Sequence, residues 1–542
     1  MAAPDGNAVD FFVDRHIRDG GGERIAFVDP WRHLSYAALQ AETGRFAAAL
    51  RGAGIEREQR IALLMLDTVD FPIAFWGALR AGVIPVPINT LLPSDLVGYI
   101  LEDCRAAALF VSGPLMPALA PTFPGLPGLR RIVVAAPEGG AAQSPPELAG
   151  DARLGDLARF LAEAGADTGA AECSPDEVAF WLYSSGSTGA PKGVRHVHSS
   201  LRATADTYAR EVLRMQPDDL MFSAAKLFFA YGLGNSMTFP MAVGAGAVLL
   251  PDRPSPDAVL GMMRRFRPSL FAGVPTLYAA LLAHPALGQG AGSDRLRGCI
   301  SAGEPLPEHI GRRWRDIVGS DILDGIGSTE MLHIFLSNRP EDVRYGTTGK
   351  PVPGYRARIL DPDGREVAAG EEGELVVSGP SAAEGYWNQR DKSRRTFRGE
   401  WTHTGDVYIR DAEGYFRYCG RTDDMLKVGG IWVSPFEVEE ALIAHPAILE
   451  AAVVAHADAD GLIKPKAFVV LQQTAANADH AALREQLQAH VKDRIGVWKY
   501  PRWIEFPESL PKTATGKIQR FKLREDGPSP VAPSKAGAQR NR

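Results

Sequence analysis

Residues 183–194, Tyr-Ser-Ser-Gly-Ser-Thr-Gly-Ala-Pro-Lys-Gly-Val, follow an apolar run at 178–182. Glycines let the backbone turn its N–H groups toward an anion, hydroxyls add donors, and Lys192 adds positive charge, so the segment suits a polyphosphate. It is not a Walker A loop, because Pro191 and Gly193 stand where that loop needs Gly and Ser/Thr. A Ser/Gly-rich linker is the alternative, but linkers rarely run straight from a buried strand into a lysine. The candidate phosphate ligands are Ser184, Ser185, Gly186, Ser187, Thr188, Gly189 and Lys192.

Three further segments carry chemistry-bearing residues. Residues 324–330 end in Thr329 beside Glu330, hard oxygen donors that suit Mg²⁺ held against phosphates. Asp406 follows a glycine, and a lone carboxylate there could accept both hydroxyls of a ribose. In residues 511–520, Gly516 precedes Lys517 and would give its compact charge a flexible arm. Solvated surface charge is the alternative for Glu330 and for Lys517.

Taken in order, these segments resemble the adenylate-forming superfamily of acyl-CoA synthetases, peptide-synthetase adenylation domains and luciferases. The resemblance covers residues 10–525. It implies an enzyme that activates a carboxylic acid with ATP as an acyl-adenylate and then passes the acyl group to a thiol. The implied cofactors are ATP, Mg²⁺ and coenzyme A.

The resemblance also implies roles for single residues. Thr329 would contact phosphate, Glu330 would bind the metal, and Lys517 would neutralise the attacking carboxylate and the α-phosphate. Asp406 would bind the ribose, with Arg421 adding a cation nearby. The remaining implied positions are the adenine turn Gly303, Glu304 and Pro305; Asp324, Gly325 and Ile326; the coenzyme A segment Lys427, Gly429, Gly430 and Trp432; and the hinge Asp423. The family usually has an aromatic residue where Ile326 stands.

Apolar and aromatic residues at 228–235 and 331–335 indicate a pocket for a flat apolar acid. These two segments look most like those of benzoate-CoA ligases. In those enzymes the substrate's ring is surrounded by the residues that match Ala230, Tyr231, Gly327, His333 and Ile334. We therefore expect benzoate or a small substituted benzoate rather than a long-chain acid. Core packing is the alternative for any one aromatic residue. Another carboxylic acid or a carrier protein stays open as substrate or acceptor; a non-catalytic nucleotide sensor is disfavoured, since binding alone would not require Lys517.

These residues must be positioned by helices and strands, and the pattern of those elements along the sequence predicts an α/β fold. Strand-like runs at 60–65, 108–111 and 131–134 alternate with helix-like stretches at 35–53 and 70–81, typical of helices around largely parallel sheets. Pro/Gly-rich stretches at 113–129 and 137–150 predict surface loops, and the apolar run at 237–250 predicts a buried strand or helix.

Beyond residue 350, short strands separated by turns at 361–364 and 370–373 predict a small β-rich unit. Ser434 and Pro435 predict a helix start, and Leu483, Leu487 and Val491 share one face of a later helix. Between them, residues 448–456 and 466–472 predict strands. We predict a large N-terminal domain at 1–421, a small mobile α+β domain at 422–525, and a disordered tail at 526–542.

The chain has 542 residues, a formal net charge of −6 and four scattered cysteines. This charge offers no basic face for nucleic acid, and the cysteines fit a reducing cytosol. The N-terminus lacks signal-peptide features, and no apolar run reaches the roughly 20 residues of a membrane span. We expect a cytoplasmic monomer or homodimer that binds small molecules and neither nucleic acid nor a membrane.

Overall fold

A computed structural model of the chain describes residues 6–126, 128–136, 150–165, 169–186, 189–422, 424–428, 431–458, 462–475, 478–496, 499–512 and 518–524. The chain forms two compact units. The first contains residues 1–358, 376–404 and 411–417, and the second contains residues 359–375, 405–410 and 418–542. The domain limit placed between residues 421 and 422 stays a prediction.

The largest sheet of the first unit has nine strands in the order β16-β15-β14-β13-β12-β10-β11-β1-β2. The six strands from β14 to β1 run parallel, and antiparallel strands flank them. The bounds are β16 (Lys350–Pro351), β15 (Ile334–Ser337), β14 (Ile322–Gly327), β13 (Gly298–Ser301), β12 (Leu270–Gly273), β10 (Leu220–Ser223), β11 (Gly246–Val248), β1 (Ile25–Val28) and β2 (His33–Ser35).

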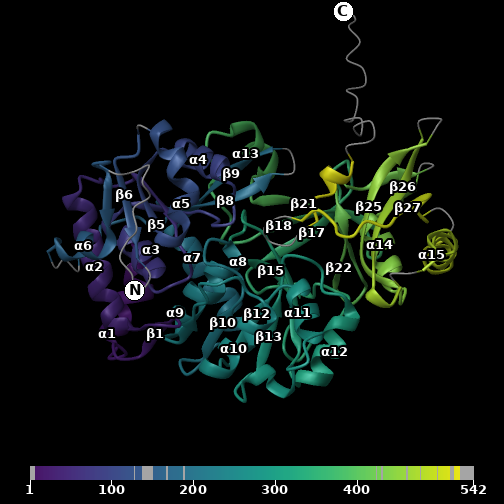
Figure 1. The fold of residues 1–542 in the computed structure, drawn as a ribbon, viewed down its shortest axis with the longest axis horizontal. Helices are drawn as coiled ribbons and strands as arrows, with labels where there is room; N and C mark the ends of the chain where they lie inside the picture. Colours follow the sequence, from purple (N-terminus) through teal and green to yellow (C-terminus); the bar gives the residue numbers. More distant parts are fainter. Residues whose placement is uncertain are drawn as a thin grey trace, which may run out of the picture. The chain divides into compact units, whose positions relative to one another are not determined.

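One face of this sheet is covered by α10 (Pro256–Phe266), α11 (Pro275–Leu282) and α12 (Glu308–Val318), whose apolar residues join those of β10, β12 and β13 in one buried cluster. Figure 1 shows these helices beside the strands. Because the central strands are parallel, their carboxyl ends open at one edge of the sheet, where α/β proteins place their ligand sites.

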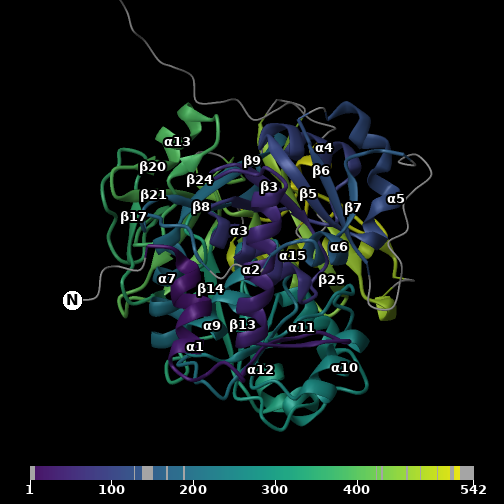
Figure 2. The same cartoon turned by 90° about the vertical axis from the view of Figure 1, so that its left-hand side faces the viewer.

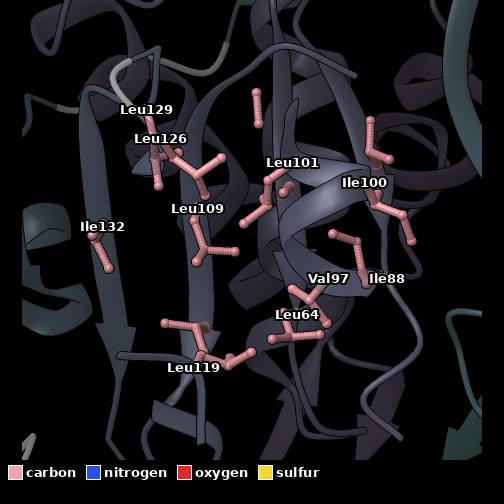
Figure 3. Close-up of a cluster of buried hydrophobic side chains, with 14 of the residues drawn as sticks. Leu64, Ile88, Val97, Ile100, Leu101, Leu109, Leu119, Leu126, Leu129 and Ile132 are labelled. Carbon is pink, nitrogen blue, oxygen red and sulfur yellow. The ribbon is translucent and has the colours of Figure 1, made fainter. Parts of the chain in front are cut away.

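A second, five-stranded sheet is parallel throughout, in the order β4-β3-β5-β6-β7. The bounds are β4 (Ile84–Pro87), β3 (Arg60–Leu64), β5 (Ala106–Ser112), β6 (Arg131–Ala135) and β7 (Leu154–Asp156). On one face, helix α4 (Ser94–Asp103) buries Val97, Ile100 and Leu101 against Leu64 and Leu109 (Figure 3). The predicted strands, and the largely parallel sheets, are confirmed.

The other face of this sheet is covered by α2 (Tyr36–Gly52) and α3 (Asp70–Ala81), seen in front of the strands in Figure 2. Phe46 of α2 lies 4.8 Å from the ring of Phe110 in β5, centroid to centroid. Gly77 of α3 has no room for a side chain, because a Cβ there would lie 2.6 Å from Phe46. The two helices predicted at 35–53 and 70–81 are confirmed, and they are packed tightly enough to exclude a methyl group.

The surface loop predicted at 113–129 was wrong. The segment forms short helical turns at 113–115, 120–125 and α5 (Met116–Leu119), and it buries Met116, Leu119 and Phe123 in the core of the second sheet. Prolines disfavour long helices but are tolerated at the start of short ones, so apolar burial determines this segment. Most of the loop predicted at 137–150 lies outside the described residues. The apolar run at 237–250 is buried and divides into α9 (Phe239–Val243) and β11.

A small antiparallel sheet carries the phosphate-binding candidates. Strands β8 (Val178–Gly186) and β9 (Gly189–Val197) form a hairpin, and β19 (Gly385–Tyr386) pairs with β9. The sequence predicted a strand only to residue 182. The extended backbone continues through Gly186, so most candidate ligands lie on strand positions with defined partners.

In the second unit, β25 (Ile448–Ala457), β26 (Ile463–Leu471) and β27 (Trp503–Glu505) form a sheet covered by α14 (Pro435–Ile443) and α15 (His480–Ile495). The Ser434 side chain caps α14 by accepting a hydrogen bond from the Glu437 N–H at 3.2 Å. Leu483, Leu487 and Val491 are the buried residues of α15. These predictions are confirmed.

A further small sheet contains β17 (Arg356–Leu360), β18 (Glu372–Ser378), β20 (Phe397–Arg398), β21 (Trp401–Arg410) and β22 (Phe416–Arg421). It confirms the β-rich unit predicted after residue 350, and its strands contribute residues to both compact units. The tail predicted to be disordered, 526–542, lies outside the described residues. None of the described helices combines the length and apolar content that crossing a bilayer requires.

Candidate active site

One face of the β8–β9 hairpin presents the hydroxyl of Ser184 and the ammonium of Lys192. The two residues are register partners, and cross-strand partners project their side chains to the same face. Ser184 Oγ is buried and has no hydrogen-bond partner among the described residues. An unsatisfied buried hydroxyl is costly and calls for a partner, so this atom is available to a ligand oxygen.

Lys192 is held against a carboxylate by two contacts. Its Nζ lies 3.0 Å from Glu330 Oε1 and donates to the Tyr386 hydroxyl at 2.8 Å, and that hydroxyl in turn donates to Glu330 Oε1 at 2.8 Å. Lys192 Nζ also lies 4.0 Å from the centre of the Tyr386 ring, a cation–π contact. The three side chains come from β9, β19 and the turn after β14, so the fold joins segments distant in sequence.

The pKa of Glu330 reflects two opposed effects. Burial alone would raise it, but the charge and hydrogen bond of Lys192, with the Tyr386 hydroxyl, lower it below its ordinary value. Glu330 is therefore an ionised carboxylate with 15% of its side chain exposed. An ionised, partly exposed carboxylate beside a lysine can exchange its partner for a metal ion while the lysine turns to a phosphate.

Strand β14 leads into this carboxylate through two glycines that cannot be replaced without displacement. A Cβ on Gly325 would lie 2.9 Å from Ile334, and one on Gly327 would lie 2.5 Å from the carbonyl oxygen of His333. Burial raises the pKa of the Asp324 carboxyl, at the same strand, well above its usual range. Ile326 and Thr329 are half-buried. Thr329 is fixed through its carbonyl oxygen, which lies 2.8 Å from Nε2 of His196 in β9.

The predicted acyl-pocket residues come together around His333. Its Nε2 lies 3.3 Å from the carbonyl oxygen of Tyr231, in α8 (Ala230–Leu233), and its ring centroid lies 4.4 Å from that of Phe239 and 5.4 Å from that of Tyr208. Ile334 follows His333 and is also buried. Burial lowers the pKa of His333 to about 3, so the imidazole is neutral at physiological pH. The described side chains packed against His333 here are aromatic or aliphatic and uncharged.

The predicted adenine turn, residues 303–305, follows β13, and Gly303 has the left-handed φ of +95° that favours glycine. In the second unit, Asp406 and Arg421 are brought together, with Arg421 Nη1 donating to Asp406 Oδ1 at 2.9 Å. The left-handed Gly405 (φ +70°) lies directly before this carboxylate, and its carbonyl oxygen accepts the Thr422 N–H at 3.0 Å.

Comparison with known proteins identifies the family. The AMP-binding enzyme family matches residues 13–387, and the AMP-binding enzyme C-terminal domain matches residues 437–517. The chain belongs to the AMP-binding enzyme family. It is 52% identical to a 4-hydroxybenzoate–CoA/benzoate–CoA ligase of Rhodopseudomonas palustris, over 97% of this chain and 95% of that protein. It is 53% identical to a benzoate–CoA ligase of Thauera aromatica, over 96% of this chain and 95% of that protein.

The fold of this AMP-binding enzyme is also matched by a solved structure. The crystal structure of a benzoate CoA ligase from Burkholderia xenovorans LB400 has a TM-score of 0.86 and 46% identity, over 96% of this chain and 100% of that one. The resemblance that the sequence motifs indicated is therefore confirmed at the level of the family and of the fold.

The donor set at Glu330 fits Mg²⁺ in an AMP-binding enzyme. Mg²⁺ takes oxygen ligands, keeps several waters, and is bound through one or two carboxylates together with substrate phosphates. The described residues contain no group of three or more His, Cys, Asp and Glu that could hold a metal by themselves. A metal at Glu330 would therefore take its other ligands from phosphate and water, which suits a site that meets metal and nucleotide together.

Several predicted residues of this AMP-binding enzyme cannot be placed. Ser187, Thr188, Asp423, Gly429, Gly430 and Lys517 lie outside the described residues. The side chains of Ser185, Lys427 and Trp432 are likewise outside what the structure describes. Their roles stay predictions that rest on the motifs.

Sequence reasoning missed two residues that the fold brings to the site. Tyr386 bridges Lys192 and Glu330, and His196 joins the hairpin to Thr329. Tyr386 lies in a two-residue strand and His196 in a strand of mixed polar and apolar residues, so neither stands in a local pattern that marks chemistry. Only the pairing of β19 with β9 indicates that Tyr386 faces the lysine.

Proposed function

We propose that this AMP-binding enzyme is an aromatic acid–coenzyme A ligase, with benzoate or a small substituted benzoate as its acid. It would convert the acid, ATP and coenzyme A into the aroyl-CoA thioester, AMP and pyrophosphate. One observation carries the proposal: a single short turn, residues 329–333, joins the charged Lys192–Glu330 pair to the neutral aromatic surroundings of His333. The high identity to benzoate–CoA ligases over nearly the whole chain supports the same acid.

The first step needs no general base. A benzoate carboxylate is already ionised at neutral pH, because carboxyl groups titrate near pH 4. One of its oxygens attacks the α-phosphorus of ATP, the bond from that phosphorus to pyrophosphate breaks, and the acyl-adenylate remains. The obstacle is the approach of two anions, so positioning and electrostatic stabilisation supply the catalysis.

The described residues can meet that requirement on the nucleotide side. Lys192 would hold phosphate oxygens together with the Ser184 hydroxyl, which has no hydrogen-bond partner within the described part of the chain, and Tyr386 would orient the lysine. Mg²⁺, when bound at Glu330, supplies Lewis-acid stabilisation of the phosphate charge. We propose Thr329 as a further phosphate contact and Lys517 as the cation that meets the attacking carboxylate. These roles rest on the family motifs.

On the acid side, the uncharged surroundings of His333 exclude a second charged group from the ring. A protonated imidazole would favour a dicarboxylate, whereas a neutral one leaves an apolar wall that suits benzoate. We propose Ala230, Tyr231, Gly327, His333 and Ile334 as the residues that contact the ring. An aliphatic acid would leave the aromatic surfaces poorly covered.

In the second step, the sulfur of coenzyme A attacks the acyl carbonyl carbon, the carbon–oxygen bond to AMP breaks, and the thiol proton passes to solvent. We propose residues 427–432 as the coenzyme A segment, Asp406 and Arg421 as ribose and α-phosphate contacts, and Asp423 as the hinge between the two half-reactions. The supply of ATP and coenzyme A, together with four cysteines that form no disulfide, supports a cytoplasmic enzyme. It would act as a monomer or homodimer.

The test is a product assay with the purified chain, MgATP and coenzyme A, and with benzoate, 4-hydroxybenzoate or decanoate as the acid. We expect AMP, pyrophosphate and benzoyl-CoA in equal amounts, with a larger kcat/KM for benzoate than for decanoate. Faster turnover of decanoate would overturn the assignment of the acid. An acyl-adenylate that accumulates because free coenzyme A cannot accept the acyl group would favour a carrier protein as acceptor.

A further inference from the structure

Leu332 holds an unfavourable backbone conformation in the middle of the candidate site. Its φ is +65°, in the left-handed region where the Cβ of a bulky residue is crowded by the backbone. Most other non-glycine residues of this kind, such as Glu58 and Arg214, lie on the surface, whereas Leu332 is buried, with 3% of its surface exposed. Buried strain persists only where surrounding contacts fix it, and it is frequent at functional sites.

The contacts that fix this turn act on three successive carbonyl oxygens. The oxygen of Thr329 lies 2.8 Å from His196 Nε2, that of Glu330 accepts the Ala383 N–H at 2.8 Å, and that of Met331 accepts the Ser381 hydroxyl at 2.7 Å. Within the turn, the Leu332 N–H donates to the Thr329 oxygen at 3.2 Å. The carbonyl of Thr329 is therefore tied to β9, and those of Glu330 and Met331 are tied to residues 381–383.

Ser381 is itself oriented by a second hydroxyl. The Tyr355 hydroxyl lies 2.6 Å from Ser381 Oγ. Because the single proton of Ser381 is used on the carbonyl of Met331, Tyr355 must donate to Ser381. Both side chains are buried, and Gly379 fits against Tyr355 so closely that a Cβ there would lie 2.2 Å from the ring. The two hydrogen bonds therefore run in one direction, from Tyr355 to Ser381 and from Ser381 to the carbonyl of Met331. The side chains that form them have little room to move.

The strained turn has a functionally important residue at each end. Glu330, before Leu332, carries the carboxylate that pairs with Lys192, and His333, after it, is one of the residues proposed to contact the aromatic ring. With only two residues between them, a change in the φ of Leu332 would move one end relative to the other. This turn therefore sets the distance between the Lys192–Glu330 pair and His333.

We propose that Ser381, oriented by Tyr355, is a positioning residue that holds Leu332 in its left-handed conformation and so fixes Glu330 and His333 together. The proposal rests on the proposed function, since it assigns a purpose to the spacing of those two residues. Neither Ser381 nor Tyr355 touches a reacting atom in the proposed reaction. Their effect passes through the backbone of the turn.

The test compares Ser381→Ala with Ser293→Ala. Ser293 is a matched control, because its buried hydroxyl also donates to a carbonyl oxygen at 2.7 Å, that of Pro268. Both variants should lower the Tm by a similar small amount. Only Ser381→Ala should raise the KM for benzoate and the Mg²⁺ concentration needed for half-maximal rate, each by about 5- to 10-fold, the effect expected for one lost hydrogen bond.

A second pair of variants removes only the hydroxyl of a tyrosine. Tyr355→Phe should shift both parameters in the same direction but less, while Tyr36→Phe, which loses a buried hydroxyl bonded to the Ala245 oxygen at 2.7 Å, should shift neither. Equal effects of Ser381→Ala and Ser293→Ala on both parameters would overturn the proposal, as would a change in only one parameter. Failure of the wild-type chain to use benzoate would instead contradict the proposed function.

Discussion

In the candidate site, Lys192 and Tyr386 hold Glu330 as a charged carboxylate. Glu330→Gln keeps the shape of the side chain and removes the charge that would bind Mg²⁺, so we expect a fall in kcat/KM of about 100-fold or more and a higher Mg²⁺ requirement. The assay is acid-dependent pyrophosphate release at several Mg²⁺ concentrations. Glu42→Gln, which breaks only an exposed pair with Arg45, is the control and should leave the rate unchanged. A Mg²⁺ dependence identical to that of the wild type would contradict the metal role.

Asp67 gives a prediction about stability. Burial raises its pKa from 3.8 to about 6, opposed by Lys226 and by the Leu227 N–H, which lies 3.2 Å from its carboxylate oxygens. An acid with a raised folded pKa stabilises the fold below its unfolded pKa and loses that contribution as the pH rises through the folded value. About 3 kcal/mol should therefore be lost between pH 4 and pH 6.

The Asp67→Asn variant should remove this dependence while keeping an acceptor for the Leu227 N–H. The measurement is the free energy of unfolding of both proteins from pH 4 to pH 7, taken as a difference so that other titrating groups cancel. We expect the variant to gain stability relative to the wild type as the pH rises. A difference that stays constant across this range would show that Asp67 does not titrate there.

At the scale of elements, the close approach of the π-helical segment 234–238 to the turn at His333 leaves no space for a side chain. A Cβ on Gly234 would lie 2.4 Å from His333 Cδ2, so Gly234→Ala should push the imidazole and lower kcat/KM for benzoate by about 10-fold or more. The measurement is the steady-state rate with saturating ATP and coenzyme A.

Gly261→Ala is the matched control, because Gly261 is exposed on α10 and the added methyl group would meet no described atom within 4 Å beyond the backbone of its own helix and its chain neighbours. It should leave the kinetics unchanged and stabilise the helix by up to about 1 kcal/mol. If Gly234→Ala were as harmless as Gly261→Ala, then His333 would not form a tightly packed wall of the pocket.

The elements that the sequence predicted well are those with a strong local pattern. The fully apolar run of β5 and the capped start of α14 were both predicted, since burial and capping are visible in the residues themselves. The segment at 113–129 was mistaken for a loop, because Pro and Gly hide the apolar residues that it buries. The hairpin was predicted too short, because its outer strand positions are built from Ser and Gly, which seldom indicate a strand.

The site was predicted through its motifs and completed by long-range contacts. Lys192 and Glu330 were named from separate segments, yet nothing local indicates that they form a pair or that Tyr386 bridges them. The left-handed Leu332 and the Ser381 contact are likewise invisible in the sequence, because leucine gives no sign of its backbone conformation. Such features arise only when distant strands are brought together.

At the scale of the whole molecule, we propose that Lys517 takes part in only one of the two half-reactions. Lys517→Ala should nearly abolish acyl-adenylate formation and leave thioester formation from synthetic benzoyl-AMP and coenzyme A largely intact, since its charge is needed only while two anions approach. The two half-reactions are measured separately by rapid quench. Equal losses in both would contradict an adenylation-specific role for this lysine.

The proposed function requires benzoate to attack the α-phosphorus of ATP before the thiol attacks the carbonyl. The most direct measurement follows oxygen from ¹⁸O-labelled benzoate through one complete reaction by mass spectrometry. The attacking carboxylate oxygen becomes the bridge to AMP and leaves with it, so we expect one ¹⁸O in AMP, none in pyrophosphate and one retained in benzoyl-CoA. Label in inorganic phosphate, together with ADP, would show attack at the γ-phosphorus and contradict the proposed function.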